Sequence, residues 1–129
     1  MEPNTHRAIS HELCGRPVAM DSGEATVALV TTEAMVVDDT GLVHGGFVFG
    51  AVDHAAMLAV NHPHVVLGSA QVRFVAPVRV GDEVRASATL VESRGKKRLL
   101  EVIAAVGDAV VLRGTMTAFV LDHHVLAGR

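Results

Sequence analysis

Two features of the sequence have residue types suited to chemistry: Asp53, inside a long apolar segment, and the triplet His44-Gly45-Gly46 just before that segment. A carboxylate in apolar surroundings is costly unless it is paired, and desolvation raises its pKa toward the range useful to a general base. Asp53 is therefore a candidate catalytic base. The alternative interpretation is a structural acid that caps a loop or meets a buried donor.

The His44-Gly45-Gly46 triplet stands where the apolar segment begins. If that segment is a helix, the two glycines expose backbone N–H groups at the positive end of the helix dipole. Such groups suit a negatively charged oxygen or a polarised carbonyl, as in an oxyanion hole. The alternative is a plain turn before a helix.

The spacing of the two features restricts how they can act together. Gly45 and Asp53 are eight residues apart, which is about 12 Å along a helix at about 1.5 Å per residue. A reacting carbonyl must lie within about 3 Å of both the base-bound water and the oxyanion donor. Either one feature is not catalytic, or the site combines the helix start of one subunit with Asp53 of another. The second option predicts an obligate dimer with two equivalent sites.

One helix and several strands must position these residues. The segment GFVFGAVDHAAMLAVN is apolar on nearly every side, its Ala and Leu content favours helix, and Pro63 follows its end. Residues 24–32 predict a strand, and four later segments alternate apolar and polar residues as half-buried strands do: 69–76, 83–91, 98–106 and 110–121. Short turns predict that the last three strands form an antiparallel meander. The sequence thus predicts an α+β fold, with one long buried helix against a mostly antiparallel sheet.

Composition excludes several classes of protein. The 129 residues fit one domain, and a hydrophobic content of 50% is too high for a disordered chain. A net charge of −3 and the absence of Trp and Tyr argue against nucleic acid and acidic membranes as partners. No secretory signal and no bilayer-spanning segment is recognised, and a single cysteine suits a reducing compartment. We therefore expect a cytoplasmic protein without a cofactor.

The run from Gly41 to Ala56, GLVHGGFVFGAVDHAA, resembles the signature of PaaI-type hotdog-fold acyl-CoA thioesterases. In that family an HGG triplet precedes a helix, and the acid follows at the spacing of His44 to Asp53. The similarity in element order extends over roughly residues 16–121. It implies a curved sheet around one long helix in a single domain, with two subunits paired edge to edge. The residues Gly46-Phe47, Val48, Gly50, Asp53 and Ala55 also resemble the fluoroacyl-CoA thioesterase branch.

The resemblance also implies roles for individual residues. Asp53 would be the general base or nucleophile, the N–H of Gly45 the oxyanion donor, and His44 would position the thioester or its water, beside Gly46 in the substrate site. Many members have an Asn before the triplet, where this chain has Asp38, and a Ser or Thr after the helix, for which Ser69 is nearest. A register slip of one residue would point Ser69 to the wrong face. The catalytic His of the fluoroacyl branch has no counterpart here, because that strand offers Phe74 and Val75.

The remaining candidates concern substrate phosphates and metals. Arg94 and Lys96, in a basic cluster with Lys97 and Arg98, suit the phosphates of coenzyme A, although a solvated hairpin tip is the alternative interpretation. The eight histidines include two close pairs, but no Cys or carboxylate accompanies those pairs at metal-ligand spacing. We expect no metal site. Cys14 has no local activating partner and is predicted to be inert.

These observations predict an acyl-CoA thioesterase that acts as a homodimer, with a dimer of dimers as a further option. The alternative is a non-catalytic protein that binds or senses acyl-CoA. We expect no transcriptional sensor, since no DNA-binding segment is recognised before the domain. A hydratase or dehydratase on the same fold would need a His–acid dyad, for which His44 is the only near candidate.

Overall fold

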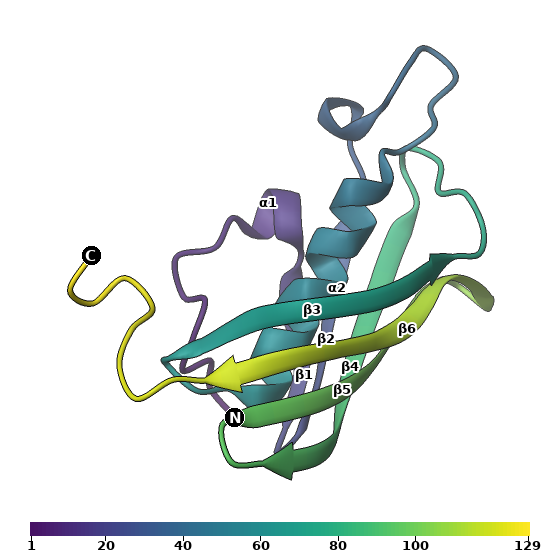
Figure 1. Cartoon of the computed structure of the whole chain (residues 1–129). Helices are drawn as coiled ribbons and strands as arrows, with labels where there is room; N and C mark the ends of the chain where they lie inside the picture. The colour runs from purple at the N-terminus through teal and green to yellow at the C-terminus, as the bar shows by residue number, and fades with distance from the viewer.

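The computed structural model describes residues 1–129 as one curved sheet wrapped around a long helix (Figure 1). Six strands form the sheet in the order β1-β2-β4-β5-β6-β3, and every neighbouring pair is antiparallel. The α+β hotdog architecture predicted from the sequence is confirmed. In chain order the elements are α1 (His11–Cys14), β1 (Arg16–Asp21), β2 (Glu24–Val30), a 3-10 turn (Glu33–Met35), α2 (Gly45–Val60), β3 (Val65–Phe74), β4 (Glu83–Arg94), β5 (Lys97–Val106) and β6 (Ala109–Val120).

Helix α2 forms the centre of the core. It begins after the N-cap residue His44, whose side chain accepts a hydrogen bond from Gly46 N–H, and it ends at Asn61 in the left-handed conformation. Most side chains from its second turn onward are buried, and many of them are alanine, which lets the strands approach closely. The fully covered helix residues are Ala51, Val52, Ala55, Ala56 and Leu58.

The inner face of the sheet completes this core through alternating residues, as predicted. On β4 the buried residues are Val84, Ala86 and Ala88, and on β5 they are Leu100, Val102 and Ala104. Strands β4, β5 and β6 form the expected antiparallel meander. Because strand side chains alternate between faces, the residues between these positions lie on the outer face.

The N-terminal part of the chain differs from the sequence prediction. No element was predicted in residues 1–15, yet they lie along α2 and include the short helix α1 (Figure 1). Strand β1 was not predicted, because this edge strand has no buried residue and therefore no alternating apolar pattern. Strand β3 begins four residues earlier than the predicted 69–76, since Val65 is also a core residue.

Strand β3 is an open edge of the sheet. Its partner β6 covers one side, while no element of the chain pairs with the other. The residues from Gly68 to Gln71 are exposed, and the apolar side chains of Phe74 and Val75 at its end are 58% and 54% exposed. An exposed edge of this kind is a template for pairing with another chain.

Candidate active site

Asp53 lies near the middle of α2 and is only partly exposed. Its Oδ1 atom is buried and has no hydrogen-bond partner in the chain. Burial raises the pKa of the Asp53 carboxyl, and the positive charge of nearby His6 acts in the opposite direction. A buried acceptor without a donor is rare and calls for an explanation, such as a catalytic role or a partner outside the chain.

The start of α2 presents an unused backbone donor. Gly46 N–H donates to Nδ1 of His44 at 2.8 Å, so this amide is satisfied. Gly45 N–H, one residue earlier, has no intrahelical acceptor because it occupies the first turn, and no other backbone acceptor in the chain receives it. Gly45 N–H is therefore the free backbone donor at the helix start, while His44 caps the helix through Gly46 N–H.

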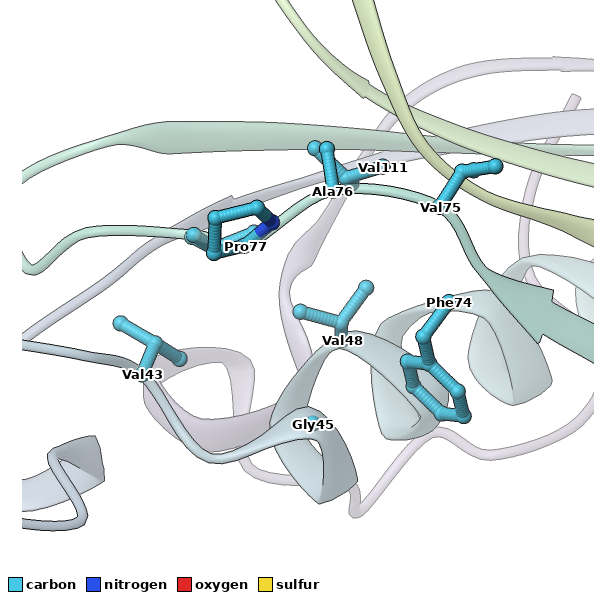
Figure 2. A pocket seen from close by; sticks show the side chains of 9 residues that line it. Val43, Gly45, Val48, Phe74, Val75, Ala76, Pro77 and Val111 are labelled. Carbon is cyan, nitrogen blue, oxygen red and sulfur yellow. The ribbon is translucent and has the colours of Figure 1, made fainter.

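An apolar pocket opens beside Gly45 (Figure 2). Its volume is about 360 Å³, and seven of its nine lining residues are hydrophobic. The Phe74 ring packs against Gly45 so closely that a Cβ on Gly45 would lie 3.1 Å from its Cε1 atom. The remaining walls come from the loop before α2, the helix, the segment after β3, and β6, through Val43, Val48, Val75, Ala76, Pro77, Val78 and Val111.

One face of α2 is left uncovered by the chain. Gly46, Gly50 and Asp53 follow each other at spacings of four and three residues, so they share one side of the helix. Gly46 is exposed, and a Cβ on Gly50 would meet nothing within 4 Å. The buried faces of α2 pack on the sheet, whereas this face is open to a ligand or a second chain.

A single chain does not bring Gly45 and Asp53 together. Both lie on the continuous helix Gly45–Val60, so the eight-residue spacing corresponds to about 12 Å along the axis. The pocket beside Gly45 does not include Asp53 among its lining residues. The separation expected from the sequence is therefore present in the structure.

Asp38 and Ser69 lie away from Asp53. Asp38 is exposed in the loop before α2, where its Oδ1 accepts hydrogen bonds from Oγ1 and N–H of Thr40, and these bonds lower its pKa. Ser69 pairs with Thr117, whereas the next residue, Ala70, pairs with the buried Met116. Since neighbouring residues alternate, Ser69 faces away from α2.

A bulge explains the direction of Ser69. The register of β3 against β6 shifts between Leu67 and Ser69, at Gly68. A Cβ at Gly68 would overlap the ring of Phe119, so only glycine fits this position without movement of the ring. The one-residue slip considered in the sequence is thus present at this point.

Arg94 and Lys96 lie at the far end of the molecule from Gly45. Their hairpin adjoins the end of β6, since Lys97 pairs with Phe119 and β6 ends beside Val65, the first residue of β3. Each has a carboxylate partner: Arg94 contacts Glu92 at 3.3 Å and Lys96 contacts Asp122 at 3.0 Å. Both pairs are exposed, so each contributes little to stability.

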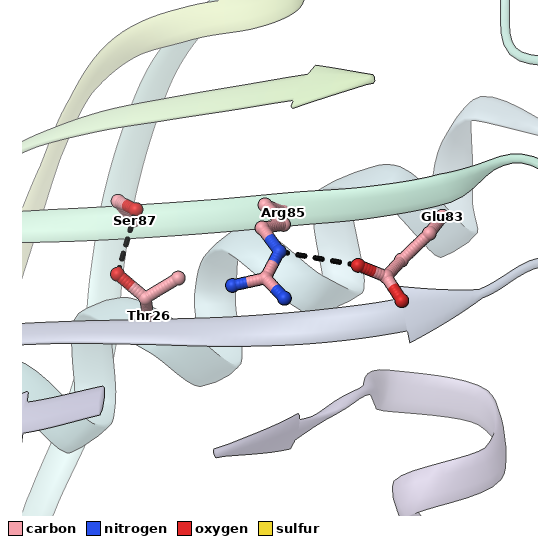
Figure 3. A network of polar contacts seen from close by, with 4 residues as sticks. All are labelled: Thr26, Glu83, Arg85 and Ser87. Carbon is pink, nitrogen blue, oxygen red and sulfur yellow. Dashed lines mark hydrogen bonds and ion pairs between the residues drawn. The ribbon is translucent and has the colours of Figure 1, made fainter. Parts of the chain in front are cut away.

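The outer face of the sheet is polar. Thr26 and Ser87 share a hydrogen bond of 2.8 Å between their hydroxyls, and Arg85 pairs with Glu83 at 3.1 Å (Figure 3). A broad polar groove crosses the same face and includes Arg73, Glu101 and Arg113. This face differs in character from the apolar pocket at Gly45.

The N-terminal segment brings His6 and Cys14 near Asp53, a placement that the sequence interpretation did not predict. His6 and Cys14 both lie close enough to Asp53 for its charge to raise their pKa values, although burial lowers that of His6 and is the larger cause of the rise at Cys14. His54 is 1% exposed, and its Nδ1 lies 3.2 Å from the Cys14 carbonyl oxygen. The two histidines in THRAISHELCG were the available signal, but nothing in the sequence placed them beside α2.

No group of three or more His, Cys, Asp or Glu side chains is arranged to hold a metal ion. None of the helices combines the length and hydropathy needed to cross a bilayer.

A hotdog sheet around a helix that carries HGG at its start and an acid nine residues after the histidine defines a thioesterase-type architecture. Comparison with known proteins agrees, since residues 40–102 match the family described as the Thioesterase superfamily. This match covers α2 and the strands β3, β4 and part of β5.

Solved structures extend the comparison to the whole chain. Protein PH1136 from Pyrococcus horikoshii is 50% identical with a TM-score of 0.96, covering 98% of this chain and 97% of that one. A variant of the phenylacetic acid degradation protein PaaI from Thermus thermophilus is 28% identical with a TM-score of 0.77, covering 84% of this chain and 95% of that one.

Curated relatives carry different names. A methylthioribose-1-phosphate isomerase from Aquifex aeolicus is 49% identical over 123 residues, which are 95% of this chain and 27% of that protein. The transcription factor FapR from Thermoanaerobacter is 28% identical over 119 residues, 92% of this chain and 60% of that protein. The chain thus spans only part of the curated relatives that it matches.

Proposed function

We propose that the protein is an acyl-CoA thioesterase that hydrolyses a thioester to a free acid and coenzyme A. The observation that carries this proposal is the buried, unpartnered Oδ1 of Asp53 on the uncovered face of α2. The match of residues 40–102 to the Thioesterase superfamily and the structural likeness to PaaI support the same reaction class.

Asp53 is proposed as the general base or the nucleophile. As a base, it takes a proton from water while the water oxygen bonds to the thioester carbonyl carbon; the C–S bond then breaks and the proton passes to the departing thiolate. As a nucleophile, its carboxylate attacks the same carbon and forms an anhydride, which water then hydrolyses. The raised pKa of Asp53 from burial supports both versions, because a desolvated carboxylate is a stronger base.

Gly45 is proposed as the oxyanion donor from the other subunit of a homodimer. Its N–H is unused in the chain and lies at the positive end of α2. Because Gly45 and Asp53 of one helix are too far apart, the partner's helix start has to approach the open face that carries Gly46, Gly50 and Asp53. The unpaired edge of β3 supports the edge-to-edge pairing that this requires.

The apolar pocket beside Gly45 is the proposed acyl site. A volume of about 360 Å³ and walls of Val, Phe and Pro suit an aliphatic or small aryl group. His44 is proposed to act mainly by capping α2, since its Nδ1 already accepts from Gly46. Arg94 and Lys96 remain the proposed contacts for the phosphates of coenzyme A.

The test is hydrolysis of short, medium, long and aryl acyl-CoAs, followed with a thiol reagent. Wild type should release coenzyme A, and Asp53→Asn should reduce kcat by about a thousandfold or more while the dimer persists. A single turnover in ¹⁸O-water tests for the anhydride route. Label in Asp53 establishes that route, because it requires water to attack the Asp53 carbon of the anhydride, whereas general-base catalysis places label only in the product acid. Asp53→Asn with wild-type turnover contradicts the catalytic assignment.

The second candidate is a protein that binds acyl-CoA without hydrolysing it. The similarity to a transcription factor, FapR, over 92% of this chain favours this candidate as the alternative. Mass spectrometry of the protein mixed with acyl-CoA separates the two functions. Intact ligand after hours of incubation supports binding alone, and free coenzyme A supports the enzyme.

A further inference from the structure

The N-terminal segment, residues 1–15, forms a strap along the C-terminal half of α2 and is attached to it at two points. Near the beginning of the strap, the Asn61 side chain at the end of the helix accepts a hydrogen bond from Asn4 N–H at 2.6 Å. Near its end, Nδ1 of His54 donates to the Cys14 carbonyl oxygen at 3.2 Å. Both attachments are polar.

Little apolar surface holds the strap in place. None of the 25 residues of the hydrophobic core cluster belongs to residues 1–15. Within the strap only Thr5 and Gly15 are buried, and the apolar side chain of Leu13 is 43% exposed. Hydrophobic burial is the dominant favourable contribution to folding, and an element with few buried apolar contacts opens locally at a low cost in free energy. The strap can therefore separate from α2 while the sheet and the helix stay folded.

A buried imidazole lies under the strap. His54 is 1% exposed, and the rings of two strap residues stack on it. His6 stacks at a centroid distance of 6.3 Å and an interplanar angle of 20°, and His11 at 6.4 Å and 24°. All three histidines line one cavity of about 620 Å³ that has no hydrophobic lining residue. Neutral rings pack favourably in this way, whereas imidazolium charges at such distances repel one another.

From this arrangement we infer that the strap is a latch operated by pH: it holds α2 while His54 is neutral, and protonation of His54 releases residues 1–15 from the helix. The inference does not depend on the proposed function. A neutral His54 donates its Nδ1 proton to the Cys14 carbonyl and has no charge to solvate. A protonated His54 would be a buried charge between two rings that also take up protons, and release of the strap gives that charge access to water.

The direction of the pH effect follows from the environment of His54. Burial is the largest cause that lowers the pKa of His54, and the charges of His6 and His11 lower it further, while the Cys14 and Gly15 backbone raises it. Once the strap is released, the solvated imidazole regains the usual pKa of 6.5. Between the lowered pKa and 6.5, the released form binds more protons. The free energy that holds the strap is therefore constant above about pH 6.5 and falls as the pH drops below it.

No carboxylate offsets the charge that His54 would acquire. None of the ion pairs of the chain involves His6, His11 or His54. The charge of Asp53 raises the pKa of His6 but has no influence on that of His54. Strand β1 contributes only Pro17 to the cavity. The other titratable groups around the stack are Glu2, Arg7 and Cys14.

Amide hydrogen exchange of the strap, measured by mass spectrometry from pH 7.5 to 5.0 and corrected for the intrinsic exchange rate at each pH, tests the latch. The amides of Cys14 and Gly15 are hydrogen-bonded within α1, and a helix of four residues would not keep these bonds in water once released. Their protection should be constant above about pH 6.5 and fall by up to about tenfold per pH unit below it, the slope for one proton. Peptides from β5 and β6 are the internal reference and should keep their protection.

Variants identify the group that titrates. His54→Gln keeps an amide donor for the Cys14 carbonyl but cannot ionise, so its strap protection should not change with pH, whatever its absolute level. His123→Gln is the matched control, because His123 is exposed in the C-terminal tail, and it should lose protection as wild type does. The double variant His6→Gln/His11→Gln removes the flanking charges and should lose less protection at pH 5.0 than wild type.

A proton NMR titration of the histidine Cε1–H signals gives the pKa of His54 in wild type without relying on any variant, and this pKa should lie below 6.5. Each of three results would overturn the latch: constant strap protection in wild type down to pH 5.0, a decline in His54→Gln equal to that of wild type, or a His54 pKa of 6.5 or above. A decline shared equally by β5 and β6 would also overturn it, because the whole domain would then be unfolding.

Discussion

Gly45 and Phe74 are in direct contact: the ring at the end of β3 covers the first residue of α2, and a Cβ on Gly45 would lie 3.1 Å from Cε1 of the ring. The contact joins the end of the exposed edge strand β3 to the start of α2. Phe74 and Gly45 both line the apolar pocket, and the N–H of Gly45 has no backbone acceptor in the chain. A ligand in this pocket therefore lies next to Gly45.

Gly45→Ala should therefore impair activity more than folding. The added methyl enters the pocket beside the proposed oxyanion donor, and we expect kcat/KM to fall at least tenfold. Since Phe74 is 58% exposed, its ring can shift, and the free energy of unfolding should change by less than about 1 kcal/mol. Thioester assays and urea denaturation measure the two effects. Wild-type kcat/KM in Gly45→Ala would contradict the role of this amide.

His44 should act on the stability of α2 through its cap. His44→Ala removes the acceptor for Gly46 N–H and should lower the free energy of unfolding by about 1 kcal/mol. His44→Ser, the matched control, restores a capping oxygen and should recover most of that loss. If His44→Ser recovers stability and turnover together, the histidine serves only as a cap; recovery of stability alone would show that its imidazole also acts on the substrate.

Much of this fold follows from local pattern. The long apolar segment rich in Ala and Leu predicted α2, and alternation predicted β4, β5 and β6, because each signal arises from burial against one core. Strand β1 was not predicted, for the opposite reason. It is an edge strand with no buried residue, so burial does not require apolar residues at alternate positions in its sequence.

The candidate site was predictable only in part. Asp53 and Gly45 stand out because their residue types conflict with, or interrupt, an apolar helix. His6 does not, because its contact with α2 depends on a fold-back of the N-terminal segment that no local pattern encodes. The direction of Ser69 depends on the bulge at Gly68, where the Phe119 ring of β6 leaves no room for a Cβ, and Phe119 lies far from Gly68 in the sequence.

Asp53→Asn should change how stability depends on pH. Burial raises the pKa of Asp53 in the folded protein above the usual value of 3.8, which applies to the unfolded chain. At pH values between the unfolded-state pKa and the folded-state pKa, the folded protein therefore binds more protons than the unfolded chain. The free energy of unfolding therefore falls as pH rises through that window. The Asp53→Asn variant has no carboxyl to ionise, so its free energy of unfolding should not fall in this way. The variant should be more stable than wild type at pH 7, and the difference in free energy of unfolding should shrink toward pH 4. Urea denaturation from pH 4 to 7 measures it.

Asp108→Asn is the control for that series, because Asp108 is exposed in the turn between β5 and β6. It should follow wild type within about 0.5 kcal/mol at each pH. A parallel pH dependence in Asp53→Asn and wild type would show that the Asp53 carboxyl is not desolvated in the folded protein.

Gly114→Ala should destabilise the edge of the sheet. A Cβ at Gly114 on β6 would overlap the carbonyl oxygen of Gln71 and lie 2.7 Å from Cα of Val72, both backbone atoms of β3. Because backbone cannot rotate away as a side chain can, β3 has to move, and we expect a loss of about 1–3 kcal/mol. Gly107→Ala is not a clean control, since Gly107 has a φ of 57°; Thr115→Ala on the exposed face is better and should change stability little. Equal denaturation midpoints for Gly114→Ala and wild type would contradict the close approach of β3 and β6.

Gly50 tests whether the open face of α2 receives a second subunit. In the single chain a Cβ on Gly50 meets nothing within 4 Å, so Gly50→Ala should stabilise the isolated fold by about 1 kcal/mol through helix propensity alone. In the proposed dimer the partner's helix start approaches this face, and the longer side chain of Gly50→Leu should weaken dimerisation at least tenfold and remove most activity. Sedimentation at several protein concentrations measures the first effect and thioester hydrolysis the second. Because a leucine in open space would leave both untouched, a fully dimeric and active Gly50→Leu would place the partner elsewhere and require Asp53 to find its oxyanion donor on another surface.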